Sequence, residues 1–129
     1  MQLERFDHVN VRTTRLQAMV DWYGEVLGMR PGERPPFAFG GAWLYLGDQA
    51  LVHLVEVQEA PRADYPGLEH FALKAKGLAG FLAALAARGE KHKVNVVPGF
   101  GIIQVNIWDP DGNHIHIDFG PEEKAALES

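Results

Sequence analysis

Four histidines are the residues of this 129-residue chain whose type and spacing best suit chemistry. They are His8, His53, His70 and His116, and each lies in a segment expected to form a β-strand. Neutral imidazole is a ligand for zinc, iron, nickel and copper. A single histidine on a strand is more often a hydrogen-bonded wall or rim residue, so the metal-site prediction depends on all four occurring together.

Pairs of residues with matching roles recur along the chain at nearly one offset. The pairs 62 or 63 positions apart are His8 and His70, Leu16 and Leu78, Asp48 and Asp111, and His53 and His116. A fixed offset between similar segments indicates an internal repeat. The sequence therefore predicts two copies of one βαβββ unit, which would bring the four histidines toward one centre.

The elements that must position these histidines follow from the apolar patterns. In the first unit we expect a strand over residues 6–12, a helix, a proline-rich connector over 30–36, and strands over 42–46 and 50–57. Thr13 or Thr14 would cap the helix and Gly28 would end it. The second unit repeats this with a strand over 68–75, a helix ending at Gly89, and strands over 94–98, 102–108 and 114–119.

Each unit alone is too small for a good core, so the two are expected to be modules of one α+β domain over residues 1–129. Module 1 covers about residues 3–60 and module 2 about residues 67–120, with a linker between them and a tail over residues 121–129. Each helix must bury its apolar stripe, so the apolar face of each sheet should face its helix. The opposite faces would enclose a cleft.

Polar and aromatic side chains share the cleft face with the four histidines. The substrate-pocket candidates there are Asn10, Arg12, Trp43, Tyr45, Lys74, Gln104, Asn106, Trp108 and His114. The aromatic members could equally pack against a second subunit, and the cationic ones could be solvated strand ends. Asp118 is the candidate proton carrier. We expect His114 at the rim, His92 in solvent, and Glu56 and Glu69 pointing away from the site.

Composition narrows the function classes. The chain has no cysteine, which excludes disulfides, thiolate zinc sites and cysteine nucleophiles and fits a reducing cytoplasm. With 17 acidic and 12 basic residues the net charge is -5, the wrong sign for generic attraction to nucleic acid or anionic lipid. No apolar run approaches the length that spans a bilayer. We expect a soluble, cytoplasmic protein with a small-molecule substrate, and neither a nucleic-acid nor a membrane partner.

Four segments carry a resemblance to a known family. They are FDHVNV at residues 6–11, WYGEVLG at 22–28, EHFAL at 69–73 and DPDGN at 109–113. Together they resemble the vicinal oxygen chelate superfamily, which includes glyoxalase I, extradiol dioxygenases, methylmalonyl-CoA epimerase, and the fosfomycin and bleomycin resistance proteins. The resemblance implies two βαβββ modules forming an open, mixed-sheet barrel with helices on the outer face, often in a homodimer.

The resemblance also implies that metal ligands lie on the first and last strands of each module. By position these are His8, His53, His70 and His116. The chain departs from the family at His116, where Glu is usual, and at His53, where glyoxalase I has Glu. The usual carboxylate base is therefore missing, which disfavours lactoylglutathione lyase activity, and an all-histidine set also departs from the extradiol dioxygenases.

The sequence is consistent with two functions. The leading one is an enzyme, a metal-dependent dioxygenase or a lyase or isomerase, in which three or four of these histidines hold Fe(II), Mn(II), Ni(II) or Zn(II) and the substrate chelates the ion through adjacent oxygens. The alternative is a metal-free protein that binds or sequesters a small molecule, as bleomycin resistance proteins do, with the histidines as hydrogen-bonded wall residues.

Overall fold

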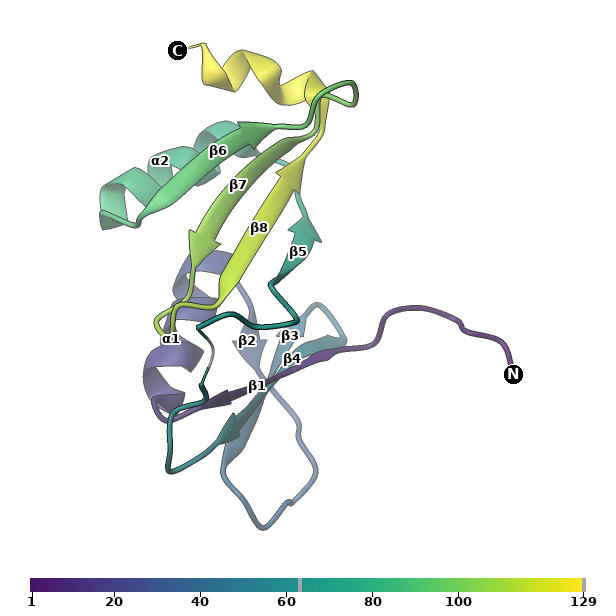
Figure 1. The fold of residues 1–129 in the computed structure, drawn as a ribbon, viewed down its shortest axis with the longest axis vertical. Coiled ribbons are helices and arrows are strands. Elements are labelled where there is room, and N and C mark those ends of the chain that lie inside the picture. The colour runs from purple at the N-terminus through teal and green to yellow at the C-terminus, as the bar shows by residue number, and fades with distance from the viewer. Residues whose placement is uncertain (63, 129) are drawn as a thin grey trace. The chain divides into compact units, whose positions relative to one another are not determined.

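The computed structural model describes residues 1–62 and 64–128, and the chain divides into two compact units (Figure 1). Unit 1 is Met1–Asp64 and unit 2 is Tyr65–Ser129. Each unit holds a strand, a helix and three further strands in chain order. The predicted α+β class and the two βαβββ modules are therefore confirmed.

Unit 1 is a four-stranded mixed sheet with one helix. Its elements are β1 (Val9–Thr13), α1 (Leu16–Leu27), β2 (Arg30–Pro31), β3 (Gly41–Leu46) and β4 (Gln49–Glu56). The strand order is β1-β4-β3-β2, in which β1 runs parallel to β4 and the other neighbours are antiparallel. Helix α1 contacts β2, β3 and β4, and its Met19 and Tyr23 are fully buried.

Unit 2 has the same order of elements. They are β5 (His70–Lys74), α2 (Leu78–Arg88), β6 (His92–Val96), β7 (Ile103–Trp108) and β8 (His114–Phe119), followed by the 3₁₀ helix η1 (Pro121–Leu127). The strand order is β5-β8-β7-β6, again with a single parallel pair, β5 with β8. Figure 1 shows α2 behind this sheet, and the ring of Phe81 on α2 lies 5.9 Å from that of Phe119 on β8.

Equivalent residues of the two units have equivalent strand partners. The matched pairs are Val9–Val52 and Phe71–Ile115, Asn10–His53 and Ala72–His116, and Trp43–His53 and Asn106–His116. The offsets are the 62 and 63 positions seen in the sequence. Because the side-chain period of a strand is two, this agreement of register places His53 and His116 on corresponding faces of their sheets.

The apolar faces of the two sheets are most deeply buried on β3, β4, β7 and β8, whereas the apolar residues of the edge strands β1 and β5 are half-buried. The buried strand residues are Leu44, Val52, Leu54, Ile103, Val105, Ile107, Ile115, Ile117 and Phe119. Leu46 shares a face of β3 with Leu44, but it is 49% exposed. It is the last residue of β3, next to the turn that Gly47 makes with a φ of 62°, so it lies beyond the cover of the helix.

Both helices end at the predicted glycines, but the start of α1 differs from the prediction. Gly28 and Gly89 have φ angles of 71° and 68°, the left-handed conformation of a helix C-cap. The N-cap of α1 is Arg15, with no side-chain cap, and Thr13 instead accepts a hydrogen bond from the Arg15 N–H at 2.9 Å. No helix among the described residues is long and apolar enough to cross a membrane.

Two segments for which the sequence predicts no helix or strand contain short elements of secondary structure. The proline-rich connector contains β2, which is only two residues long and pairs with β3. The tail after residue 120 forms η1, and its Glu123 carboxylate accepts hydrogen bonds from the backbone N–H groups of Gly77, at 3.0 Å, and Leu78, at 2.8 Å. Since Gly77 offers α2 no capping side chain, Glu123 takes that role from 45 residues downstream.

The DPDGN segment is a turn organised by Asp109, which is 4% exposed. Its Oδ1 accepts hydrogen bonds from the backbone N–H groups of Asp111, at 3.0 Å, and Asn113, at 2.9 Å. The Asn113 amide donates to both carboxylate oxygens, and Gly112 has a φ of 84° that favours glycine. The motif therefore joins β7 to β8 and fixes the position at which His114 begins the last strand.

Candidate metal-binding residues

In unit 1 the two candidate histidines lie against each other. His8 precedes β1 and His53 lies on β4, and their rings stack with centroids 3.8 Å apart and an angle of 8° between the planes. Trp43, the β3 partner of His53, stacks on it at 3.9 Å. His8, His53 and Trp43 therefore form a stack of three rings.

Each of these histidines commits one ring nitrogen to an acceptor. His8 Nδ1 donates to Asp7 Oδ2 at 2.7 Å, and His53 Nε2 donates to the Ala50 carbonyl at 3.0 Å. Burial lowers the pKa of His53, and the nearby His8 adds to this effect, whereas the hydrogen bond from His8 lowers the pKa of Asp7. His8 Nε2 and His53 Nδ1 keep their lone pairs in this arrangement. Because an imidazole lone pair lies in the ring plane, parallel stacked rings bind one shared ion only if one of them turns.

Beside the stack, unit 1 has an open hollow of about 560 Å³. Its lining includes Phe37, Trp43 and Tyr45 together with His8 and His53. Tyr45 donates its hydroxyl to the Glu33 carbonyl at 2.5 Å, which orients its ring. Three aromatic side chains with a few charged groups, Arg5, Asp7 and Asp48, suit a flat organic ligand.

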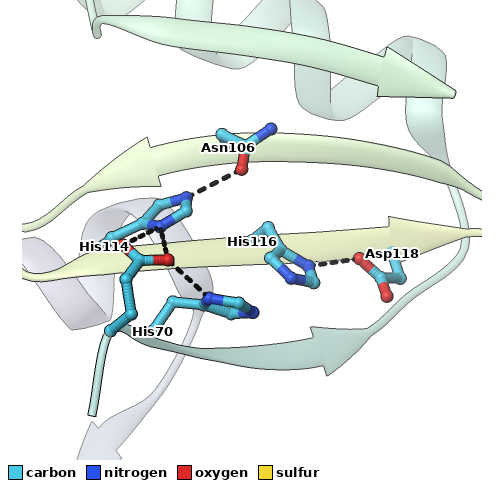
Figure 2. A network of polar contacts seen from close by, with 6 residues as sticks. His70, Asn106, His114, His116 and Asp118 are labelled. Atoms are coloured by element: carbon cyan, nitrogen blue, oxygen red, sulfur yellow. Dashed lines mark hydrogen bonds and ion pairs between the residues drawn. The ribbon is translucent and has the colours of Figure 1, made fainter. Parts of the chain in front are cut away.

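In unit 2 three histidines gather on neighbouring strands β5 and β8 (Figure 2). The ring of His70 lies 4.4 Å from that of His116 and 5.1 Å from that of His114. The rings are tilted rather than stacked, at 43° and 54°. His116 is 8% exposed, and its Nδ1 donates to Asp118, the candidate proton carrier, which leaves Nε2 with its lone pair.

Glu69 joins this group, contrary to the prediction that it points away. Its carboxylate accepts hydrogen bonds from His70 Nδ1, at 2.7 Å, and from His114 Nδ1, at 2.9 Å. These bonds, the one from His70 foremost, lower the pKa of Glu69. The prediction relied on strand alternation, but β5 begins at His70, so Glu69 precedes the strand and its side chain turns back toward the imidazole. Asp7, its equivalent 62 residues earlier, does the same with His8.

His114 is held on both sides and is more than a rim residue. Its Nε2 contacts Asn106 Oδ1 at 2.7 Å (Figure 2). Asn106 Nδ2 in turn donates to the Lys93 carbonyl at 3.0 Å. Both ring nitrogens thus face acceptor oxygens, which fixes the orientation of the ring. Trp108 stacks on the ring at 5.4 Å, with the Lys91 ammonium 4.6 Å from the centre of Trp108.

The remaining sequence candidates lie apart from these hydrogen bonds. Asn10, Arg12 and Lys74 are exposed, and Gln104 is partly buried. Glu56 is exposed, as is His92, whose Nδ1 donates to the Glu90 carbonyl at 2.8 Å. Of the described residues that could jointly hold an ion, Glu69, His70 and His114 have ligating atoms all within 4.8 Å of one another.

The model of the Glyoxalase/Bleomycin resistance protein/Dioxygenase superfamily matches residues 5–117. The chain belongs to this superfamily. No curated protein sequence matches the chain.

Solved structures agree with this membership of the Glyoxalase/Bleomycin resistance protein/Dioxygenase superfamily at the level of the fold. A glyoxalase family protein from Bacillus anthracis is 23% identical, with a TM-score of 0.78 over 93% of this chain and 98% of that one. A glyoxalase family protein from Enterococcus faecalis is 27% identical, with a TM-score of 0.72 over 92% and 99%. Lactoylglutathione lyase from Agrobacterium tumefaciens is 18% identical, with a TM-score of 0.71 over 95% and 98%.

Proposed function

We propose that this chain is a divalent-metal enzyme acting on a small substrate that chelates the ion through adjacent oxygens. Three or four of His8, His53, His70 and His116 would hold Fe(II), Mn(II), Ni(II) or Zn(II). When bound, such an ion would stabilise negative charge that develops on the chelating oxygens. The proposal includes the cytoplasmic homodimer expected from the sequence.

One observation carries this proposal. Each of the four histidines donates one ring nitrogen to an acceptor oxygen, from Asp7, Ala50, Glu69 or Asp118, and keeps the other nitrogen. Histidines that bind metals in proteins are held in this way, because the donated hydrogen bond fixes the tautomer and the ring orientation. The donor set therefore fits a transition metal, which prefers imidazole to water or amide ligands.

In this proposal, other residues of the chain orient the substrate and transfer a proton. The aromatic side chains of the unit 1 hollow would position an apolar part of the substrate. Asp118 contacts the buried ring of His116 and is 27% exposed at its side chain, so it can exchange a proton with solvent. It is the carboxylate that we assign to proton transfer in a chain that lacks the family's usual glutamates.

Metal analysis of protein purified without an affinity tag tests the proposal. We expect a stoichiometric divalent metal in the wild type, and its loss in a His8→Ala, His70→Ala double variant. His92→Ala is the matched control, because the His92 side chain is exposed and donates to the nearby Glu90 carbonyl. Protein without stoichiometric metal, with no difference in metal affinity between these variants, would contradict the proposal.

A second candidate function has its own observation, the aromatic hollow of unit 1. A metal-free binding protein would use Phe37, Trp43 and Tyr45 to hold a flat ligand, and Asp7 and Asp48 to attract a cationic one. A thermal-shift screen separates the two functions. The second predicts stabilisation by cationic aromatic compounds in the presence of a chelator, whereas the enzyme proposal predicts stabilisation by metal alone.

A further inference from the structure

In unit 2, three residues place potential metal-ligating atoms close together. One of them, His114, has no histidine counterpart in unit 1. We propose that Glu69, His70 and His114 form a divalent metal site that is complete within unit 2. Its ligands are a Glu69 carboxylate oxygen and the Nδ1 atoms of His70 and His114. This inference goes beyond the proposed function, since it needs none of His8, His53 and His116.

The distances suit a small ion. Glu69 Oε1 lies 2.7 Å from His70 Nδ1 and 3.1 Å from His114 Nδ1. Each of the three residues offers a ligating atom within 4.8 Å of those of the other two. Ligands at right angles on a metal with bonds of about 2.1 Å stand about 3 Å apart. The ion would replace the hydrogens that the two Nδ1 atoms now share with Glu69, after small side-chain movements.

The surroundings of His114 prepare Nδ1 for this role. Its Nε2 contacts Asn106 Oδ1 at 2.7 Å, and the Asn106 amide is fixed by its own bond to the Lys93 carbonyl. Asn106 is 7% exposed, so its oxygen is a rigid acceptor that holds the proton on Nε2. With the proton held on Nε2, the ring nitrogen available to an ion is Nδ1, which faces Glu69. This is the outer hydrogen bond expected of a ligating histidine.

Comparison of the two units shows that the βαβββ fold does not by itself require this group of residues. Glu69 and His70 correspond to Asp7 and His8, but the position that corresponds to His114 is Leu51, 63 residues earlier. Asn106 corresponds to Trp43. The same strand pairing is thus built in unit 1 without the third ligand and without its acceptor.

The donor set defines the class of ion. Two imidazoles and one carboxylate favour late first-row divalent metals, and they leave coordination positions for water or substrate. An ion on His70 Nδ1 keeps the proton on Nε2 of that ring. The four-histidine set would then retain its other three members, so both sites can be filled in one molecule.

Tryptophan fluorescence can tell the two sites apart, because each has its own reporter. Trp108 stacks on His114 and Trp43 stacks on His53. Titration of the full chain with Co²⁺, a quencher at short range, should quench Trp108 saturably. That signal is assigned by comparing Trp43→Phe, which should keep it, with Trp108→Phe, which should lose it.

The variants then test the ligands. In the Trp43→Phe background, Glu69→Gln and His114→Gln should each abolish saturable quenching, whereas His53→Gln and His116→Gln should leave it unchanged. Glu59→Gln and His92→Gln are matched exposed controls. Circular dichroism confirms that each variant is folded, and Asn106→Ala, which removes no ligand, provides an independent reduction in affinity.

The results separate this inference from the proposed function. Quenching of Trp108 that survives in both Glu69→Gln and His114→Gln overturns the site. Loss of that quenching in His53→Gln or His116→Gln also overturns it, since the ion would then belong to the four-histidine set. Loss of metal from Glu69→Gln alone, with Trp43 still quenched in a Trp108→Phe background, supports two separate sites.

Discussion

At the scale of single residues, the partner of one imidazole nitrogen decides what the other nitrogen can do. The alternation of the strands predicts which face His70 and His116 occupy, because that depends only on parity. Parity also places Asp118 on the same face as His116, to which it bonds. It cannot predict that His70 donates to Glu69, because Glu69 precedes the strand and the contact depends on the rotation of its side chain. The candidate ligands could thus be read from the sequence, whereas the role of Glu69 could not.

Asn106→Ala tests whether an outer hydrogen bond controls metal affinity. Without the Asn106 oxygen, the His114 ring loses the acceptor that holds its proton on Nε2. Co²⁺ affinity at the Glu69, His70 and His114 site should fall about 10- to 100-fold. The measurement is the midpoint of Trp108 quenching. Gln104→Ala, on the same strand but without a bond to His114, is the control, and an equal effect in both variants would contradict the role of Asn106.

A second prediction concerns the turn before His114. Asp109→Ala removes a buried carboxylate that accepts from the backbone of Asp111 and Asn113, so their N–H groups lose protein partners. The free energy of unfolding should fall by roughly 1–3 kcal/mol. Urea denaturation measures the loss, with Asp111→Ala as the control because its exposed side chain leaves these bonds in place. A similar loss in both variants would mean that the carboxylate does not organise the turn.

At the scale of elements, the alternation of apolar and polar residues predicts strands that have an apolar face. It does not predict strands that lack one. Strand β8 begins and ends at the predicted residues, because His114–Phe119 alternates throughout. Strand β2 has two residues, too few to show any period, and one of them is a proline. Strand β1 starts three residues later than predicted, so Asp7 and His8, whose side chains bond to each other, both precede it.

The cap of α2 yields a prediction at this scale. Glu123→Ala leaves the N–H groups of Gly77 and Leu78 without the carboxylate that now accepts from them. Helix α2 should lose about 1 kcal/mol, the usual contribution of an N-cap and of a negative charge at a helix N-terminus. Hydrogen exchange at these two amides should accelerate. Glu128→Ala, exposed on the same tail, should have no effect, and unchanged exchange in Glu123→Ala would refute the cap.

At the scale of the whole molecule, the chain is a duplicated module with unequal chemistry. The two sheets share strand order and residue pairing, so the backbone of one module predicts that of the other. Side chains on the polar face differ, with a stack of aromatic rings in unit 1 and a hydrogen-bonded network in unit 2. The constant offset between similar residues could reveal that the two units share a backbone fold. The different side-chain contacts of the two polar faces could be seen only in the structure.

Because the strands of the two units pair in the same register, one substitution in unit 1 should reproduce the metal site of unit 2. Leu51→His would put an imidazole at the position that corresponds to His114, one residue before Val52, the β4 partner of Val9. We expect it to lie near Asp7 and His8, which precede Val9. One Co²⁺ equivalent more than in the wild type should then bind, and it should add to the quenching of Trp43 while leaving that of Trp108 unchanged. Its affinity should be about 10- to 100-fold weaker, because Trp43 stands where Asn106 would hold the new ring. Titration of Leu51→His against Leu51→Gln measures this gain, and equal stoichiometry in the two would show that the modules are not interchangeable at this position.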